Sequence, residues 1–149
     1  MKYKIFTALL LGLFASSIQA QTMDESRVVL GNYLMRQYMV EPTDGCRIYD
    51  DLTNTYLISV VTLDKTKYKK ASDMYRVAQL KSMRNAGEYL GGTTQHTITR
   101  IVMNDDNVAV KEESNHAFSS NLVKSLELLK TFDFEENEKV FIYIQILEQ

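Results

Sequence analysis

The sequence predicts a single α+β domain in which one long helix lies across a mostly antiparallel sheet. The stretch from Lys67 to Gly92 carries small and aromatic side chains at helical spacing. It ends on two consecutive glycines, which close a helix because glycine accepts the left-handed conformation. Two further segments, Tyr56–Leu63 and Val140–Leu147, are rich in β-branched and aromatic residues, as strands are. We therefore expect one helix with strands on either side of it in the chain.

The first twenty residues have the order of a secretory signal. Lys2 and Lys4 precede an apolar run from Ile5 to Phe14, and small residues lead on to Ala20. The run is shorter than the roughly 20 residues that a membrane-spanning helix needs. We expect cleavage after Ala20, with an uncleaved anchor as the alternative. Three parts follow from this prediction: a signal peptide, an N-terminal helical arm and an α+β domain, at 1–20, 21–45 and 46–149.

Charge gives no general reason to expect a nucleic acid or an anionic membrane as partner. The chain has 17 basic and 19 acidic residues. Two of the basic residues, Lys2 and Lys4, would leave with the signal, which changes the net charge from −2 to −4. These values are ordinary for a soluble surface.

The single cysteine, Cys46, excludes an internal disulfide. It also lies far from the expected cleavage point, so no cysteine is placed there to carry a lipid. We therefore expect a periplasmic or outer-envelope protein without a lipid anchor, whose contact with a membrane is at most peripheral. For Cys46 itself we expect an ordinary thiol in the turn after Pro42, and the alternative is an intermolecular disulfide or a redox thiol.

A first helix is expected from Asp24 to Val40, because its apolar residues recur at helical spacing. Glu41 to Gly45 has the composition of a turn. The strands predicted at Tyr56–Leu63 and Val140–Leu147 are apolar on both faces, and such strands are normally covered on both faces. The long helix covers only one face of the sheet, so the N-terminal helix or another molecule must cover the other.

The stretches Thr94–Met103 and Val108–Phe118 are predicted to form a hairpin through the turn residues Asn104 to Asn107. Their polar composition suits a position near a sheet edge. The stretch 121–134 fits either a short helix or a strand. The turn residues that follow it favour a strand, which would pair with the last one.

The order of these elements is accompanied by small residues spaced along the long helix, a double glycine at its end and an aliphatic last strand (Ala71, Ala78, Ser82, Ala86; Gly91, Gly92; Lys139 to Ile144). In these features the chain, over roughly Thr55 to Leu147, resembles the twenty-kilodalton surface lipoprotein (LPP) family of bacteria and the related N-terminal domain of flagellar assembly protein T. The resemblance implies a βαβββ domain that is exported, non-enzymatic and associated with the cell envelope. The chain departs from the family by lacking the lipidation cysteine and by carrying Tyr75 at a small-residue position. The family offers no catalytic residues to transfer.

The two histidines are the candidate metal ligands. If the hairpin closes with Val102 opposite Val110, then Arg100 faces Glu112 and His96 faces His116. Two opposed imidazoles can bind a transition metal or respond to pH. The simpler interpretation is that His96 and His116 are two unrelated surface histidines, since no acid or cysteine is placed to complete a site.

The candidate partner-binding residues are Leu80, Lys81 and Arg84. They lie in a local excess of basic residues on the side of the helix that points away from the small-residue stripe. A solvated helix face explains that excess, and the alternative is an acidic partner or lipid headgroups.

We expect no enzymatic activity and no cofactor, because no nucleophile–base or metal-ligand spacing is present. The predicted function is a binding or assembly role in the cell envelope, through an envelope protein partner or self-association. The alternative is a periplasmic module that binds a small ligand or a metal.

Overall fold

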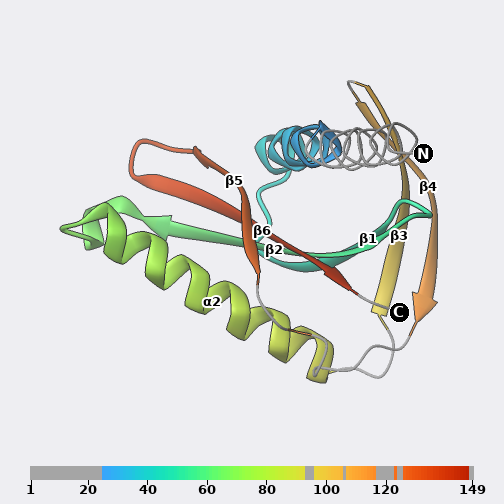
Figure 1. Ribbon diagram of the computed structural model, residues 1–149. Coiled ribbons are helices and arrows are strands. Elements are labelled where there is room, and N and C mark those ends of the chain that lie inside the picture. Colours follow the sequence, from blue (N-terminus) through green and yellow to red (C-terminus); the bar gives the residue numbers. More distant parts are fainter. Residues whose placement is uncertain (1–24, 93–95, 106, 117–122, 124–125, 148–149) are drawn as a thin grey trace, which may run out of the picture.

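A computed structural model describes residues 25–92, 96–105, 107–116, 123 and 126–147 (Figure 1). These residues form one mixed six-stranded sheet with a helix on each face. The N-terminal helix is described over residues 25–40. The other elements are β1 (Gly45–Asp50), β2 (Thr55–Asp64), the 3₁₀ turn η1 (Lys65–Lys67), α2 (Ala71–Gly92), β3 (His96–Asn104), β4 (Asn107–His116), β5 (Glu127–Asp133) and β6 (Glu138–Leu147). The predicted α+β class, with its N-terminal helix, is confirmed.

The strands follow the order β4-β3-β1-β2-β6-β5, so β1 and β2 are the middle strands, β6 lies between β2 and the edge strand β5, and β4 is the other edge. The ladder between β2 and β6 is antiparallel and runs the whole length of both strands, from Thr55 opposite Leu147 to Asp64 opposite Glu138. Every neighbouring pair is antiparallel except β1 and β3, which are parallel. As predicted, the polar hairpin of β3 and β4 lies at one side of the sheet.

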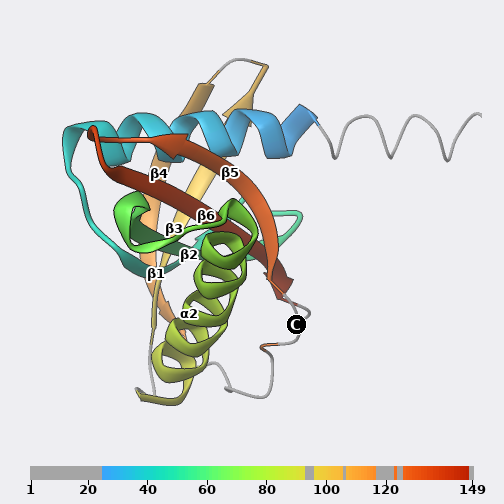
Figure 2. The ribbon, with the colours of Figure 1, turned by 90° about the vertical axis from the view of Figure 1, so that its left-hand side faces the viewer.

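Strands β2 and β6 are buried on both faces, and the two helices cover them (Figure 2). On one face α2 covers a core that includes Leu57, Phe141 and Tyr143. On the other face the N-terminal helix contributes Leu30, Leu34 and Tyr38 to a core with the alternate residues of the same strands. The N-terminal helix therefore forms the second covering layer, which strands that are apolar on both faces require.

The small-residue stripe of α2 faces the sheet as predicted from Ala78 on, whereas Ala71, at the start of the helix, is exposed. Ala78, Ser82 and Ala86 are all fully buried, and small side chains there let the helix lie close to the strands. The predicted start of the helix at Lys67 is wrong. Asp64 caps the short turn η1 by accepting a hydrogen bond from the Thr66 amide at 2.9 Å, and α2 begins only at Ala71.

Strand β1 was not predicted, because the turn signals around Pro42 and Gly45 run directly into its six residues. Cys46 consequently lies in this strand, opposite Ser59 of β2, and not in a turn. Its side chain is half-buried. Burial raises the pKa of the Cys46 thiol, and a hydrogen bond with Ser59 opposes that shift. A raised pKa disfavours the thiolate, which is the reactive form.

The hairpin brings the predicted partners together through a different register at its turn. Val102 pairs with Ala109, not with Val110, so the predicted closing pair is wrong. A bulge between Arg100 and Ile101 absorbs one residue, and beyond it Arg100 pairs with Glu112 as expected. In the stretch 121–134, residues from Glu127 on form a strand that pairs with β6. Residues 121, 122, 124 and 125 lie outside the described part.

Candidate functional site

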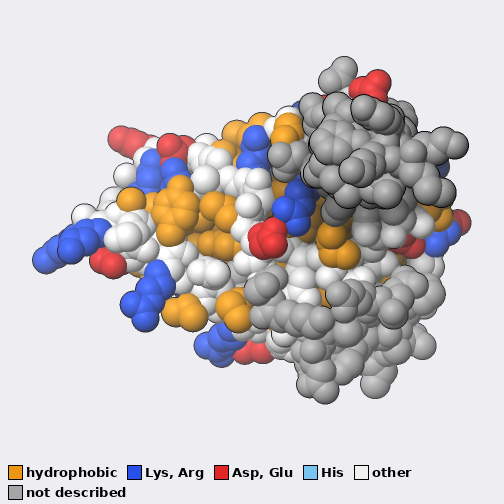
Figure 3. Space-filling view, viewed as in Figure 1, with side chains coloured by type: hydrophobic (Ala, Val, Ile, Leu, Met, Phe, Trp, Pro, Cys, Tyr) orange, Lys and Arg blue, Asp and Glu red, His pale blue; other side chains and the backbone are white. Residues whose placement is uncertain are grey.

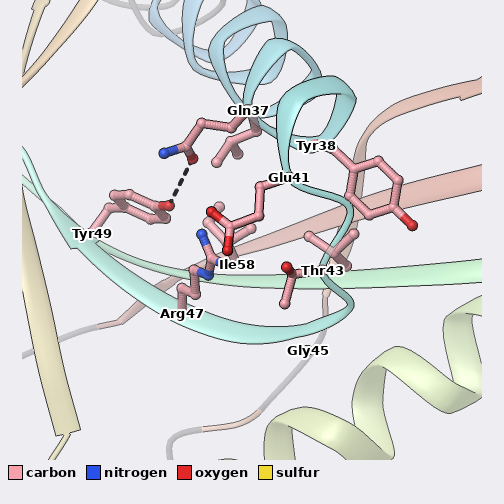
Figure 4. Close-up of a pocket in the computed structure, with 10 residues that line it drawn as sticks. Gln37, Tyr38, Glu41, Thr43, Gly45, Arg47, Tyr49 and Ile58 are labelled. Carbon is pink, nitrogen blue, oxygen red and sulfur yellow. Dashed lines mark hydrogen bonds between the residues drawn. The ribbon is translucent and has the colours of Figure 1, made fainter.

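A small polar pocket lies where the N-terminal helix ends over β1 and β2 (Figure 4). Gln37, Glu41, Arg47 and Tyr49 supply its polar groups, and the Tyr49 hydroxyl donates a hydrogen bond to Gln37 Oε1 at 3.3 Å. Its volume is about 50 Å³. A water molecule takes roughly 30 Å³, whereas pockets for small organic ligands measure about 300–1,000 Å³. The pocket therefore has room for one or two waters and no metabolite.

A larger, open groove lies on the opposite face of the sheet, between α2 and β5. Its volume is about 560 Å³. The lining residues come from α2, from the start of β5 and from β6: Tyr75, Arg76, Gln79, Leu126, Glu127, Leu128 and Tyr143. Figure 3 views this side of the molecule, and hydrophobic side chains emerge beside β5, above α2. We take this groove as the candidate functional site.

The groove exists because α2 is fixed over the middle of the sheet and does not reach the β5 edge. The Tyr75 ring packs edge-to-face on Phe141 of β6, with 5.0 Å between ring centroids. The Tyr143 hydroxyl donates a hydrogen bond to the Tyr75 carbonyl oxygen at 3.4 Å. These contacts hold the first half of α2 to β6. Among the described residues, the neighbouring strand β5 consequently has no cover on this face.

Leu128 shows the result most directly. It pairs with Tyr143 across the β5–β6 ladder, so its side chain points to the same face of the sheet as α2. It nevertheless remains 42% exposed, and Tyr75 across the groove is 37% exposed. Leu128 and Tyr75 thus border a hollow, and an apolar side chain placed in it would contact both of them.

The opposite face of β5 is closed by the N-terminal helix. Arg27 forms an ion pair with Glu127 at 2.8 Å, and Lys130 Nζ donates a hydrogen bond to Asn32 Oδ1 at 2.8 Å. Phe132 packs against Tyr38 with 5.9 Å between ring centroids. The strand is therefore held in place from one side and open on the other. Its outer edge also has no strand neighbour among the described residues.

The charges at the groove do not cancel fully. The Glu127 carboxylate is compensated by Arg27. Arg76 has no ion-pair partner in the part of the chain that the structure describes. Burial, followed by the influence of Tyr75, raises the pKa of Tyr143 to about 12, so this residue presents a neutral hydroxyl. Counting only the described residues, the groove is therefore apolar with one uncompensated positive charge.

The candidates from the sequence lie beside the groove and not in it. Leu80 is 58% exposed on the outer side of α2, and Lys81 next to it is exposed as well. Arg84 forms an ion pair with Glu88 at 2.7 Å. The groove residues Leu128 and Tyr143 were missed, because their proximity to Tyr75 depends on the position of α2 across the sheet. Knowing that β5 is an edge strand would have drawn attention to Leu128.

His96 and His116 are opposite one another in the β3–β4 ladder, as predicted. The His96 side chain is 3% exposed, and its ring packs on Tyr89 with 4.6 Å between centroids. It is therefore part of the interior and not a surface histidine. The side chain of His116 lies outside the described part. Among the side chains that are described, no group of three or more His, Cys, Asp or Glu residues is arranged to hold a metal ion.

No protein-family model, curated protein or solved structure matches this chain. Within the described ranges, no helix combines the length and the apolar composition that crossing a membrane requires.

Proposed function

We propose that this protein is exported to the bacterial cell envelope and has a non-enzymatic binding or assembly role there, in which the groove between α2 and β5 receives an extended segment of a partner protein. The observation that carries the proposal is the half-exposed pair Tyr75 and Leu128 beside a strand edge. The order of the first twenty residues supports the export step.

An edge strand offers unpaired backbone N–H and C=O groups, to which an extended peptide adds as a further strand. Specificity in this binding mode comes from pockets for alternate side chains. The hollow between Tyr75 and Leu128 is such a pocket for an apolar side chain. The positive charge of Arg76 at its border favours a partner segment that also carries an acidic residue.

A binding role fits the lining better than catalysis does. The groove contains one carboxylate, that of Glu127, and Arg27 already pairs with it. General acid–base or nucleophilic chemistry needs a second group within hydrogen-bond reach of the first. The alternative, a small-ligand module, has weaker support, since the pocket near Gln37 measures only about 50 Å³.

Site-specific photo-crosslinking in bacterial cells tests this proposal. A photoreactive amino acid replaces Leu128 at the groove or, in the control, Val110, which is 51% exposed on the opposite edge strand β4. We expect a discrete protein adduct from position 128 and none from position 110. Equal labelling at both positions, or no adduct at position 128, would contradict a docking groove. Fractionation of the same cells, with sequencing of the N-terminus, tests export independently.

A further inference from the structure

The outer face of α2 is a second surface, which shares Arg76 with the groove and on which cations surround exposed apolar side chains. We define it by Arg76, Leu80, Lys81, Met83 and Arg84, together with the lysines Lys69 and Lys70 just before the helix. Leu80 is 58% exposed and Met83 is 36% exposed. Figure 3 shows Lys and Arg side chains at the tip where α2 begins and along its lower side, with hydrophobic side chains between them.

The charge of the molecule is divided unevenly, and this face carries the positive part. Residues 64–88 hold seven basic and three acidic residues, a net charge of +4. The remainder of the chain holds ten basic and sixteen acidic residues, a net charge of −6. Three of the seven cations form ion pairs: Lys67 with Asp64 at 3.9 Å, Arg84 with Glu88 at 2.7 Å and Lys65 with Asp133 at 3.4 Å. The third acidic residue of the segment, Asp73, is exposed. The other four cations, Lys69, Lys70, Arg76 and Lys81, have no ion-pair partner among the described residues. The overall charge of −2 therefore conceals a positive surface.

We propose that the outer face of α2 docks on the surface of an anionic lipid bilayer. The lysines and arginines would lie at the headgroups, and Leu80 and Met83 would enter the interface between headgroups and acyl chains. Long basic side chains suit this position, because their aliphatic stems lie along apolar surface while the charges stay in water.

The shape of the surface favours a bilayer over an acidic protein. The groove is hollow, whereas this face is the convex side of a helix of 22 residues. A convex row of cations can contact the flat surface of an anionic bilayer along its whole length. Protein interfaces are instead often anchored by aromatic side chains that enter pockets. The apolar members of this face are a leucine and a methionine, and Tyr75 points to the groove.

Vesicle co-sedimentation tests the proposal with two pairs of charge reversals. One variant combines Lys81→Glu and Arg84→Glu. Its matched control combines Arg36→Glu and Lys111→Glu, at exposed positions on the N-terminal helix and on β4. Both change the net charge by the same amount, and both keep residues 1–20, so any binding through that segment is equal in the two. Arg76 is left unchanged because it also borders the groove.

We expect binding to phosphatidylcholine vesicles with about 30% phosphatidylglycerol and little binding to phosphatidylcholine alone. Each basic residue near such a surface contributes roughly fivefold in the binding constant, so Lys81→Glu with Arg84→Glu should weaken binding at least about tenfold. The control variant should bind like the original protein. Leu80→Ser should weaken binding by a smaller factor, about threefold, that persists when salt is raised.

Three results would overturn the proposal. One is equal binding to both kinds of vesicle, and another is an equal loss in the two double variants. The third is a protein adduct from a photoreactive group at position 80 in cells, together with no vesicle binding, which would assign the face to an acidic protein. Crosslinking at position 128 is unaffected by any of these results, so the groove and the outer face are tested separately.

Discussion

The two faces of the sheet are closed in different ways. Under the N-terminal helix, large side chains from both sides interlock, as Leu30, Leu34 and Tyr38 do with the aliphatic face of β6. Under α2, the middle of the helix contributes the small side chains Ala78, Ser82 and Ala86, with Met74 and Leu90 nearer its ends, and the strands contribute most of the large side chains. One face is therefore sealed across to the edge strand, whereas the other is packed closely in the middle and open at β5.

This difference indicates a division of labour between the helices. The N-terminal helix holds one face of the edge strand β5 through Arg27 and Asn32. Because α2 lies over the middle of the sheet, it leaves the other face of β5 accessible. The features that suit binding thus lie on the face where the helix carries the smaller side chains.

The largest effect is expected where the interlocking is tightest. Leu30 is 1% exposed, and Leu30→Ala should lower the free energy of unfolding by about 2–5 kcal/mol, because it removes buried methyl groups and leaves a cavity. Urea unfolding measures the loss. The control, Val28→Ala, changes a residue of the same helix that is 62% exposed and should stay within about 0.5 kcal/mol. Similar losses in both variants would mean that the helix does not cover this face through Leu30.

The face under α2 should instead be sensitive to added volume. Ala86 is fully buried, and Ala86→Leu should cost about 1–3 kcal/mol, since the helix must move off the strands to admit the larger side chain. Gly87→Ala is the control on the next residue: a Cβ there has no neighbour within 4 Å. It should raise the free energy of unfolding by roughly 0.5–1 kcal/mol, because alanine favours a helix more than glycine does. A stable Ala86→Leu protein would show that α2 is not closely packed.

The smallest expected effect is a loss of stability at alkaline pH, which depends on one tyrosine on each face of the sheet. Burial and a hydrogen bond to Asp51 raise the pKa of Tyr56 to about 12, and burial raises the pKa of Tyr143 to about 12. An unfolded tyrosine ionises near pH 10. The folded protein therefore keeps protons that the unfolded chain loses, and the free energy of unfolding should fall as pH rises from about 10 to 12.

Urea unfolding at about pH 9 and about pH 11 measures this loss of stability. Replacing Tyr56 or Tyr143 by Phe should make the loss smaller, and each face can be tested with its own variant. A decrease of the same size in both variants and in the original protein would show that neither tyrosine is responsible.

The layers of the fold were predictable because they depend on alternation within single strands. Ile58 and Leu57 point to opposite faces of β2, and the sequence alone requires a cover for each. The groove was not predictable to the same extent, since it depends on how far α2 extends across the sheet. Strand β1 was missed because six residues next to turn residues give too short a pattern.

The ladder between β2 and β6 also has a consequence for the order in which the chain gains structure. It joins residues 55–64 to residues 138–147, so α2 and the strands β3, β4 and β5 all lie between its two strands in the sequence. During synthesis β2 emerges early, with apolar side chains on both faces. It cannot complete its pairing with β6 until residue 147 has been made. A ribosome-bound fragment that ends before β6 should therefore be prone to aggregation and susceptible to proteases. It would depend on chaperones to remain in solution.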